Sequence, residues 1–171
     1  MQNGQTKRIF NKELLSITID RLCYQLIENH NDFKGTVIIG IQSRGVLVSR
    51  RIFKRLQEIN PTINIEYGEL DISFYRDDFR RRELIVPSAN KMDIQVEGKV
   101  VVLVDDVLYT GRTIRAALDA LLDFGRPTKV ELLALIDRKF SRELPIAADY
   151  IGQSIDTIAS EKVLVQLQSD D

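Results

Sequence analysis

Three runs of consecutive apolar residues alternate along the chain with stretches whose apolar residues recur every three or four positions. The runs, which are rich in Val, Ile and Leu, lie at 36–41, 100–104 and 130–136. Runs of this kind are typical of strands that are buried on both faces of a parallel sheet. The periodic stretches, which predict amphipathic helices, lie at 12–29, 46–59 and 114–124. The alternation predicts an α/β fold in which a mostly parallel sheet is flanked by helices on both faces.

The remaining segments are less regular. Residues 63–67 and 69–75 are predicted strands, and two short late strands are predicted at 145–152 and 163–167. From Arg76 to Gln95 the chain turns polar, with a Pro-Ser-Ala-Asn turn at 87–90. This stretch predicts a long excursion, either a short hairpin or a mobile loop.

Composition limits the class of protein. The 171 residues fit a single domain, 1–171, and a hydrophobic content of 44% is enough for a sizeable core. No apolar run approaches the roughly 20 residues that span a bilayer. Residues 1–8 lack the apolar stretch of a signal peptide, and Cys23 is the only cysteine. We therefore expect a cytoplasmic protein without a membrane segment, and the formal net charge of −1 gives no global attraction to nucleic acid.

The most informative motif follows the central apolar run. Asp105 and Asp106 come directly after it, and a turn with Thr110, Gly111 and Thr113 precedes the next helical stretch. Acids at the carboxyl end of a parallel strand lie where open α/β sheets bind ligands. Hydroxyls and backbone N–H groups at a helix N-terminus attract phosphate. The plain alternative is a solvated acid pair with a helix cap, but the whole segment suits a phosphorylated sugar, and the chain has neither a Walker A loop nor a Gly-x-Gly-x-x-Gly fingerprint.

This segment resembles the signature of the type I phosphoribosyltransferases, which bind 5-phosphoribosyl-1-pyrophosphate (PRPP). The resemblance implies their fold, with a mobile lid loop and a small hood, and magnesium (Mg2+) as cofactor, bound through PRPP. It implies that Asp105 and Asp106 are catalytic, because they can accept hydrogen bonds from the ribose hydroxyls and oppose the positive charge that develops on the ring. The residues that it implies for binding the ribose 5-phosphate are Val107, Leu108, Tyr109, Thr110, Gly111, Arg112 and Thr113.

The leaving pyrophosphate needs a second cradle. Ser43, Arg44 and Gly45 stand between an apolar run and a helical stretch, where the matching loop of the phosphoribosyltransferases binds pyrophosphate. Arginines on a mobile lid can clamp the same group while the lid excludes water. We therefore include Arg76 and Arg80 among the candidate pyrophosphate ligands.

Later blocks narrow the resemblance. The segments at 142–152 and 160–167, together with Tyr-Arg-Asp-Asp at 75–78, are similar to the pyrimidine operon attenuator/uracil phosphoribosyltransferase family over roughly residues 9–168. This implies that uracil and PRPP react to UMP and pyrophosphate, with Arg138 and Val163 flanking the uracil. It also implies UMP-dependent binding to pyrimidine operon leader RNA, and a homodimer or higher homo-oligomer.

The chain departs from that family where RNA is concerned. Members that bind RNA carry basic residues at the positions of Ala147 and Gln153, and His and Thr at those of Tyr24 and Asp20, whereas Arg21 and Arg142 remain as candidate RNA contacts. Fewer positive charges should weaken phosphate contacts. Two alternatives stay open, namely a non-catalytic nucleotide-sensing RNA-binding regulator and a purine phosphoribosyltransferase.

Overall fold

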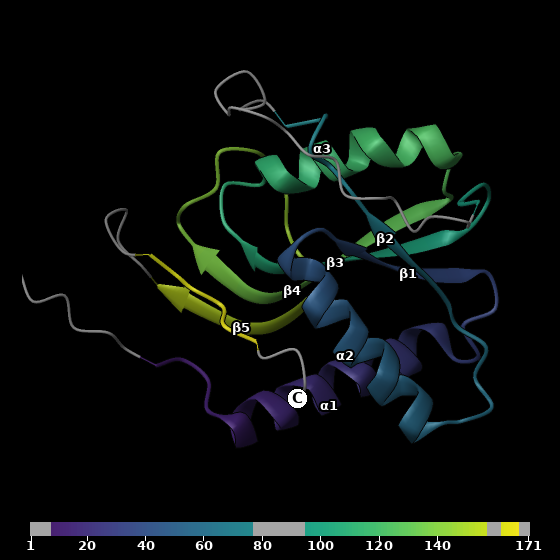
Figure 1. Cartoon of the computed structure of the whole chain (residues 1–171), viewed down its shortest axis with the longest axis horizontal. Coiled ribbons are helices and arrows are strands. Elements are labelled where there is room, and N and C mark those ends of the chain that lie inside the picture. The colour runs from purple at the N-terminus through teal and green to yellow at the C-terminus, as the bar shows by residue number, and fades with distance from the viewer. Residues whose placement is uncertain (1–7, 77–94, 157–161, 168–171) are drawn as a thin grey trace, which may run out of the picture.

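The computed structural model describes residues 8–76, 95–156 and 162–167, and it has a five-stranded sheet at its centre. The strand order is β2-β1-β3-β4-β5, and every neighbouring pair runs parallel (Figure 1). The strands span Thr36–Ile41 (β1), Glu66–Leu70 (β2), Val100–Leu108 (β3), Lys129–Lys139 (β4) and Tyr150–Asp156 (β5). The predicted parallel sheet is confirmed, and the three apolar runs form its three central strands.

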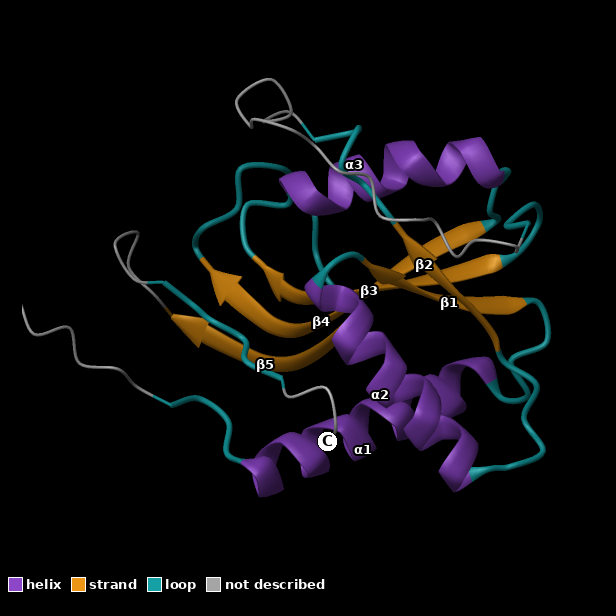
Figure 2. Ribbon diagram, in the orientation of Figure 1, coloured by secondary structure: helices purple, strands orange, loops and turns teal. Residues whose placement is uncertain are grey.

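Helices cover both faces of this sheet (Figure 2). Helices α1 (Lys12–His30) and α2 (Arg44–Ile59) pack on one face. Helix α3 (Arg112–Leu121), which a short 3-10 turn at Leu122–Phe124 extends, packs on the other. Because parallel strands must be joined by crossovers, this arrangement gathers the carboxyl ends of β1 and β3 and the first turns of α2 and α3 along one edge of the sheet.

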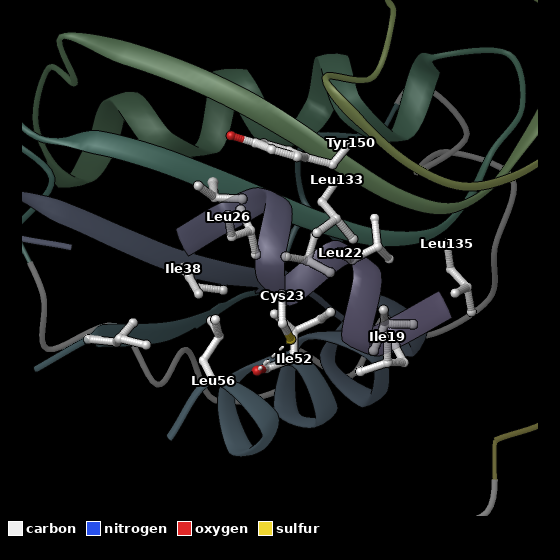
Figure 3. Packing of buried hydrophobic residues seen from close by; sticks show 14 of the residues in the cluster. Ile19, Leu22, Cys23, Leu26, Ile38, Ile52, Leu56, Leu133, Leu135 and Tyr150 are labelled. Carbon is white, nitrogen blue, oxygen red and sulfur yellow. Dashed lines mark hydrogen bonds between the residues drawn. The ribbon is translucent and has the colours of Figure 1, made fainter. Parts of the chain in front are cut away.

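Two apolar layers hold the elements together. Figure 3 shows Leu22 and Leu26 of α1 and Ile52 of α2 meeting Ile38 of β1; all four side chains are fully buried. Each such side chain contributes about 1.5–3 kcal/mol when it leaves water. Cys23 lies in the same layer, and burial, reinforced by the charge of Asp20, raises the pKa of its thiol to about 12. It is therefore a core residue, as its place in the apolar stripe predicts.

The structure corrects some boundaries. The two strands predicted at 63–67 and 69–75 are one short strand, because only Glu66–Leu70 of this stretch pairs with β1. The chain then enters a turn in which Tyr75 N donates to Ile72 O. The late strand begins at Tyr150 rather than at 145, since Pro145 has no N–H to donate to a ladder. Residues 163–167 form no strand. Most of the polar excursion, 77–94, lies outside the described residues, and with it Arg80 and the predicted lid.

A polar cluster is buried at the amino ends of the strands. The carboxylate of Glu131 accepts hydrogen bonds from the Tyr150 hydroxyl (2.7 Å) and from Lys129 Nζ (2.6 Å), and it lies 2.8 Å from His30 Nε2. Asn29 Nδ2 donates to the same hydroxyl at 3.0 Å. Burial raises the pKa of Glu131, but the hydrogen bonds and the nearby imidazole outweigh it, so this pKa lies below its ordinary value.

Replacing Tyr150 by Phe should therefore destabilise the fold without touching the opposite edge of the sheet. The change leaves a buried carboxylate short of a donor, which costs about 1–3 kcal/mol. We expect this loss in urea unfolding at pH 7. It should shrink as the pH falls through and below 4.5, the ordinary pKa of Glu131, because a carboxylate with a depressed pKa contributes stability only while it is ionised.

The matched control is Tyr24→Phe, since Tyr24 is 57% exposed. Equal unfolding midpoints for the two variants at pH 7 would contradict the stabilising role of this cluster.

Candidate functional site

Two buried carboxyl groups lie at the carboxyl end of β3. Asp105 and Asp106 are only 6% and 8% exposed. Because side chains alternate along a strand, Asp105 points to the α3 face and Asp106 to the α2 face. One oxygen of each accepts a main-chain hydrogen bond, from Asp106 N (2.9 Å) and Val107 N (2.8 Å) respectively. The other oxygen of Asp106 is buried, and in the described part of the chain it has no hydrogen-bond partner.

Burial makes these carboxyl groups hard to ionise. It raises the pKa of Asp105 to about 8, the charge of Asp106 adds to the effect, and Arg76 opposes it. Burial likewise raises the pKa of Asp106, against the hydrogen bond from Val107 and the charge of Arg44, whose Nη1 lies 4.0 Å from Oδ2. Both carboxyl groups are therefore harder to ionise than exposed aspartates. A ligand that brings hydroxyl donors or a cation would favour their ionisation.

The loop before α2 lies directly on this acid pair. A side chain at Gly45 would place its Cβ 2.4 Å from Val104 O and 3.2 Å from Asp105 Oδ1, so no larger residue fits there without moving the loop. Ser43 and Arg44 are exposed beside it, and the peptide bond between Gln42 and Ser43 is cis. The structure thus brings the predicted Ser43–Gly45 segment against the predicted acids.

The turn after β3 forms the wall of a cavity of about 610 Å³. Gly111 takes a left-handed conformation (φ +92°) at the start of α3, and Thr110 Oγ1 accepts a hydrogen bond from Arg112 N. The N–H groups of a first helical turn have no partner within the helix and favour anions. The residues that line the cavity are Arg76, Asp105, Val107, Leu108, Tyr109, Thr110, Gly111, Arg112, Thr113 and Ile114.

All seven residues predicted to bind the ribose 5-phosphate therefore line one cavity with Asp105, and Arg76, at the start of the predicted lid, lines it too. Asp106 faces the other side of the strand end, toward Arg44. The sequence already indicates this difference, because consecutive residues of a strand point to opposite faces of the sheet.

The predicted base residues lie beside this cavity rather than in its lining. The guanidinium of Arg138 lies over the ring of Tyr109, 4.0 Å from its centre, and Arg138 is only 5% exposed. Val163 is half-buried against the core of the α1–α2 face, which also contacts Val107 of the cavity wall. Sequence reasoning did not find the contact between Tyr109 and Arg138, because no spacing rule joins the end of β3 to the end of β4.

The predicted RNA contacts are engaged within the fold. Arg21 of α1 donates to the carbonyls of Ile151 and Gly152 on β5. Arg142 donates to several main-chain carbonyls and pairs with Asp137. Asp20, whose charge was expected to repel RNA, is paired with Arg55 at 2.6 Å.

The described residues contain no group of three or more His, Cys, Asp or Glu that could hold a metal ion. A magnesium ion that is bound through the substrate would find one suitable protein atom here, the Asp106 oxygen that has no hydrogen-bond partner among the described residues. Within the same residues, no helix is long and apolar enough to cross a bilayer.

Known proteins are similar in sequence to this chain over nearly its whole length. The "Bifunctional protein pyrR" of Enterococcus faecalis is 41% identical over 165 residues, which is 96% of this chain and 92% of that protein. The "Pyrimidine operon regulatory protein" of Lactococcus lactis is 44% identical over the same share of both chains.

Solved structures show the same fold at lower identity. A hypoxanthine phosphoribosyltransferase from Staphylococcus aureus superposes with a TM-score of 0.69 at 20% identity, over 90% of this chain and 80% of that one. One from Trypanosoma cruzi gives 0.72 at 16% identity, over 92% and 82%. The model of the phosphoribosyl transferase domain matches residues 5–170. The chain therefore belongs to the phosphoribosyltransferase domain family and, within it, to the PyrR group.

Proposed function

We propose that this protein transfers the phosphoribosyl group of PRPP to uracil and forms UMP and pyrophosphate. The proposal is carried by one observation: Asp105 and Asp106 lie at the edge of the sheet between two segments that could bind anions. One is the Ser43–Gly45 loop, which rests on the main chain of β3, and the other is the first turn of α3. Only a substrate with a polyol between two phosphate groups uses all three features.

In this reaction the bond between C1′ of the ribose and the pyrophosphate oxygen breaks, and its electron pair leaves with pyrophosphate. N1 of uracil bonds to C1′ and loses its proton to solvent. Asp105 and Asp106 would accept hydrogen bonds from the ribose hydroxyls and stabilise the positive charge that develops on the ring. Arg44 would hold the departing pyrophosphate, and Arg76 would approach it from the side of the cavity. Magnesium bound with PRPP would neutralise the leaving group.

The base would enter between the ends of β3 and β4. The buried guanidinium of Arg138 lies over the ring of Tyr109, and its planar fork of N–H groups suits the carbonyl oxygens of a pyrimidine. Val107 and Val163 both pack against the core layer of the α1–α2 face, and Val107 also offers an apolar surface to the cavity. One relative is named a pyrimidine operon regulatory protein, and this name favours a pyrimidine over a purine as the base.

A regulatory function is the second candidate, since one relative is named a pyrimidine operon regulatory protein. Binding of leader RNA, strengthened by UMP, would take place in the cytoplasm. The homo-oligomer that the family implies would supply the RNA-binding surface. In this chain that surface is weak in positive charge, because Ala147 is exposed without a charge and Arg21 is committed to carbonyls of β5.

The transferase proposal is tested with PRPP, magnesium and a panel of bases. We expect UMP and pyrophosphate in equal amounts with uracil, and no turnover without magnesium. Hypoxanthine and guanine should give no nucleotide, because the relatives with similar sequences are named for pyrimidine regulation. Nucleotide formed from a purine but not from uracil would overturn the proposal.

The matched variant for this assay is Asp105→Asn. Its catalytic rate should fall by at least about 100-fold if the carboxylate acts on charge in the transition state. At pH 8 the variant should be more stable than the unmodified protein. A buried carboxyl with a raised pKa lowers the stability of the fold as the pH rises through that pKa, and the asparagine does not ionise. A variant that loses stability at pH 8 in step with activity would mark Asp105 as a structural residue.

For RNA, we expect Ala147→Arg with Gln153→Lys to raise the affinity for pyrimidine leader RNA by about tenfold or more and to steepen its salt dependence. Uracil turnover should stay unchanged, because neither residue lines the cavity. Filter binding across a salt series, with and without UMP, measures both effects. Tight binding by the unmodified protein in physiological salt, with no gain in the double variant, would contradict the weak-surface account.

A further inference from the structure

Arg142 lies between the phosphate-binding turn and the end of β4. Its guanidinium donates to the carbonyls of Tyr109 and Leu108 (3.3 Å for Leu108) and, through Nε, to Ile146 O at 2.9 Å. It also pairs with the carboxylate of Asp137. One side chain thus bonds to acceptors on β3, on β4 and on its own connection, although it lines no part of the cavity.

The residues after Arg142 make further hydrogen bonds to the same turn. The N–H groups of Glu143 and Leu144 both donate to Thr110 O, at 3.0 and 3.1 Å. The Glu143 carboxylate also accepts a hydrogen bond from Arg112 Nε at 2.6 Å. The carbonyls of Tyr109 and Thr110, two successive peptide units of the turn, are therefore drawn toward the segment 142–144.

These hydrogen bonds fix the direction of the N–H groups of the turn. In a trans peptide the C=O and N–H point in opposite directions. Holding the carbonyls of Tyr109 and Thr110 on the side of Arg142 turns the N–H groups of Thr110 and Gly111 to the other side, where both residues line the cavity. Successive N–H groups aimed into one concavity form an anion site.

The same guanidinium also bonds to both chain segments that would flank the base, the end of β3 and the end of β4. It bonds to the carbonyl of Tyr109, whose ring lies under Arg138, and to Asp137, which precedes Arg138 on β4. If Arg142 shifted, the ring and the guanidinium above it would lose their common support. A lysine could not replace it, because an ammonium lacks the planar set of donors that reaches several acceptors at once.

We propose that Arg142 is a positioning residue for phosphoribosyl transfer, which couples the 5′-phosphate cradle to the base pocket. This inference rests on the proposed function. It assigns to Arg142 an inward role beside the RNA contact that the family resemblance implies.

The test compares Arg142→Lys with Arg55→Lys in the full-length protein. Arg55 also bonds to carboxylates, those of Asp20 and Glu58, but it lies on α2 away from the cavity. We expect Arg142→Lys to lower kcat/KM for both PRPP and uracil by about 10- to 100-fold, since small misplacements of reacting groups have effects of this size. Its Kd for ribose 5-phosphate, measured by calorimetry, should rise by about tenfold. Arg55→Lys should change neither quantity.

A merely structural Arg142 would give a lower melting temperature with an unchanged Kd for ribose 5-phosphate and unchanged KM values, and that result would overturn the inference. Full kcat/KM in Arg142→Lys would overturn it as well. Absence of transfer in the unmodified protein would instead refute the proposed function, while the calorimetric comparison would still decide whether Arg142 shapes the phosphate cradle.

Discussion

The burial of two adjacent carboxyl groups at the end of the central strand is the constraint on which the rest of the site depends. Asp105 and Asp106 cannot be left fully ionised in that position without cost, because little solvent reaches them and one oxygen of Asp106 has no hydrogen-bond partner in the described residues. The fold holds them there because β3 is paired on both sides and anchored through fully buried Val101–Val104. Burial of the acid pair thus lowers the stability of the fold, and it leaves carboxyl oxygens that a polyol and a cation can bind.

The surrounding elements follow from this position. Gly45 lets the loop before α2 descend onto the main chain of β3, which brings Arg44 within reach of Asp106. Gly111 lets the chain turn directly from β3 into α3, which aims a helix N-terminus at the same cavity. Arg142 then holds that turn through a hydrogen bond to the carbonyl of Tyr109. A change in RNA affinity after mutation of Arg142 would accordingly report on the shape of the nucleotide site as well as on any direct contact with RNA.

Much of this arrangement could be predicted from the sequence. The apolar runs identified the three central strands, and the acids with the Thr-Gly turn identified the cavity, because both are local patterns. The placement of Arg138 on Tyr109 and the inward grip of Arg142 could not, since they depend on the register between β3 and β4 and on the path of residues 140–149. Asp20 shows the same limit: its charge was readable, but its pairing with Arg55 follows from the packing of α1 on α2.

The central claim is that burial makes the acid pair hard to ionise and that the bound substrate favours its ionisation. Calorimetric titration of the protein with magnesium and PRPP at pH 7, in two buffers that differ in ionisation enthalpy, measures this directly. The account predicts net release of protons from the unmodified protein, because hydroxyl donors and a cation lower the raised pKa of Asp105. It predicts a much smaller release from Asp105→Asn. Binding with the same proton balance in both proteins would contradict the account.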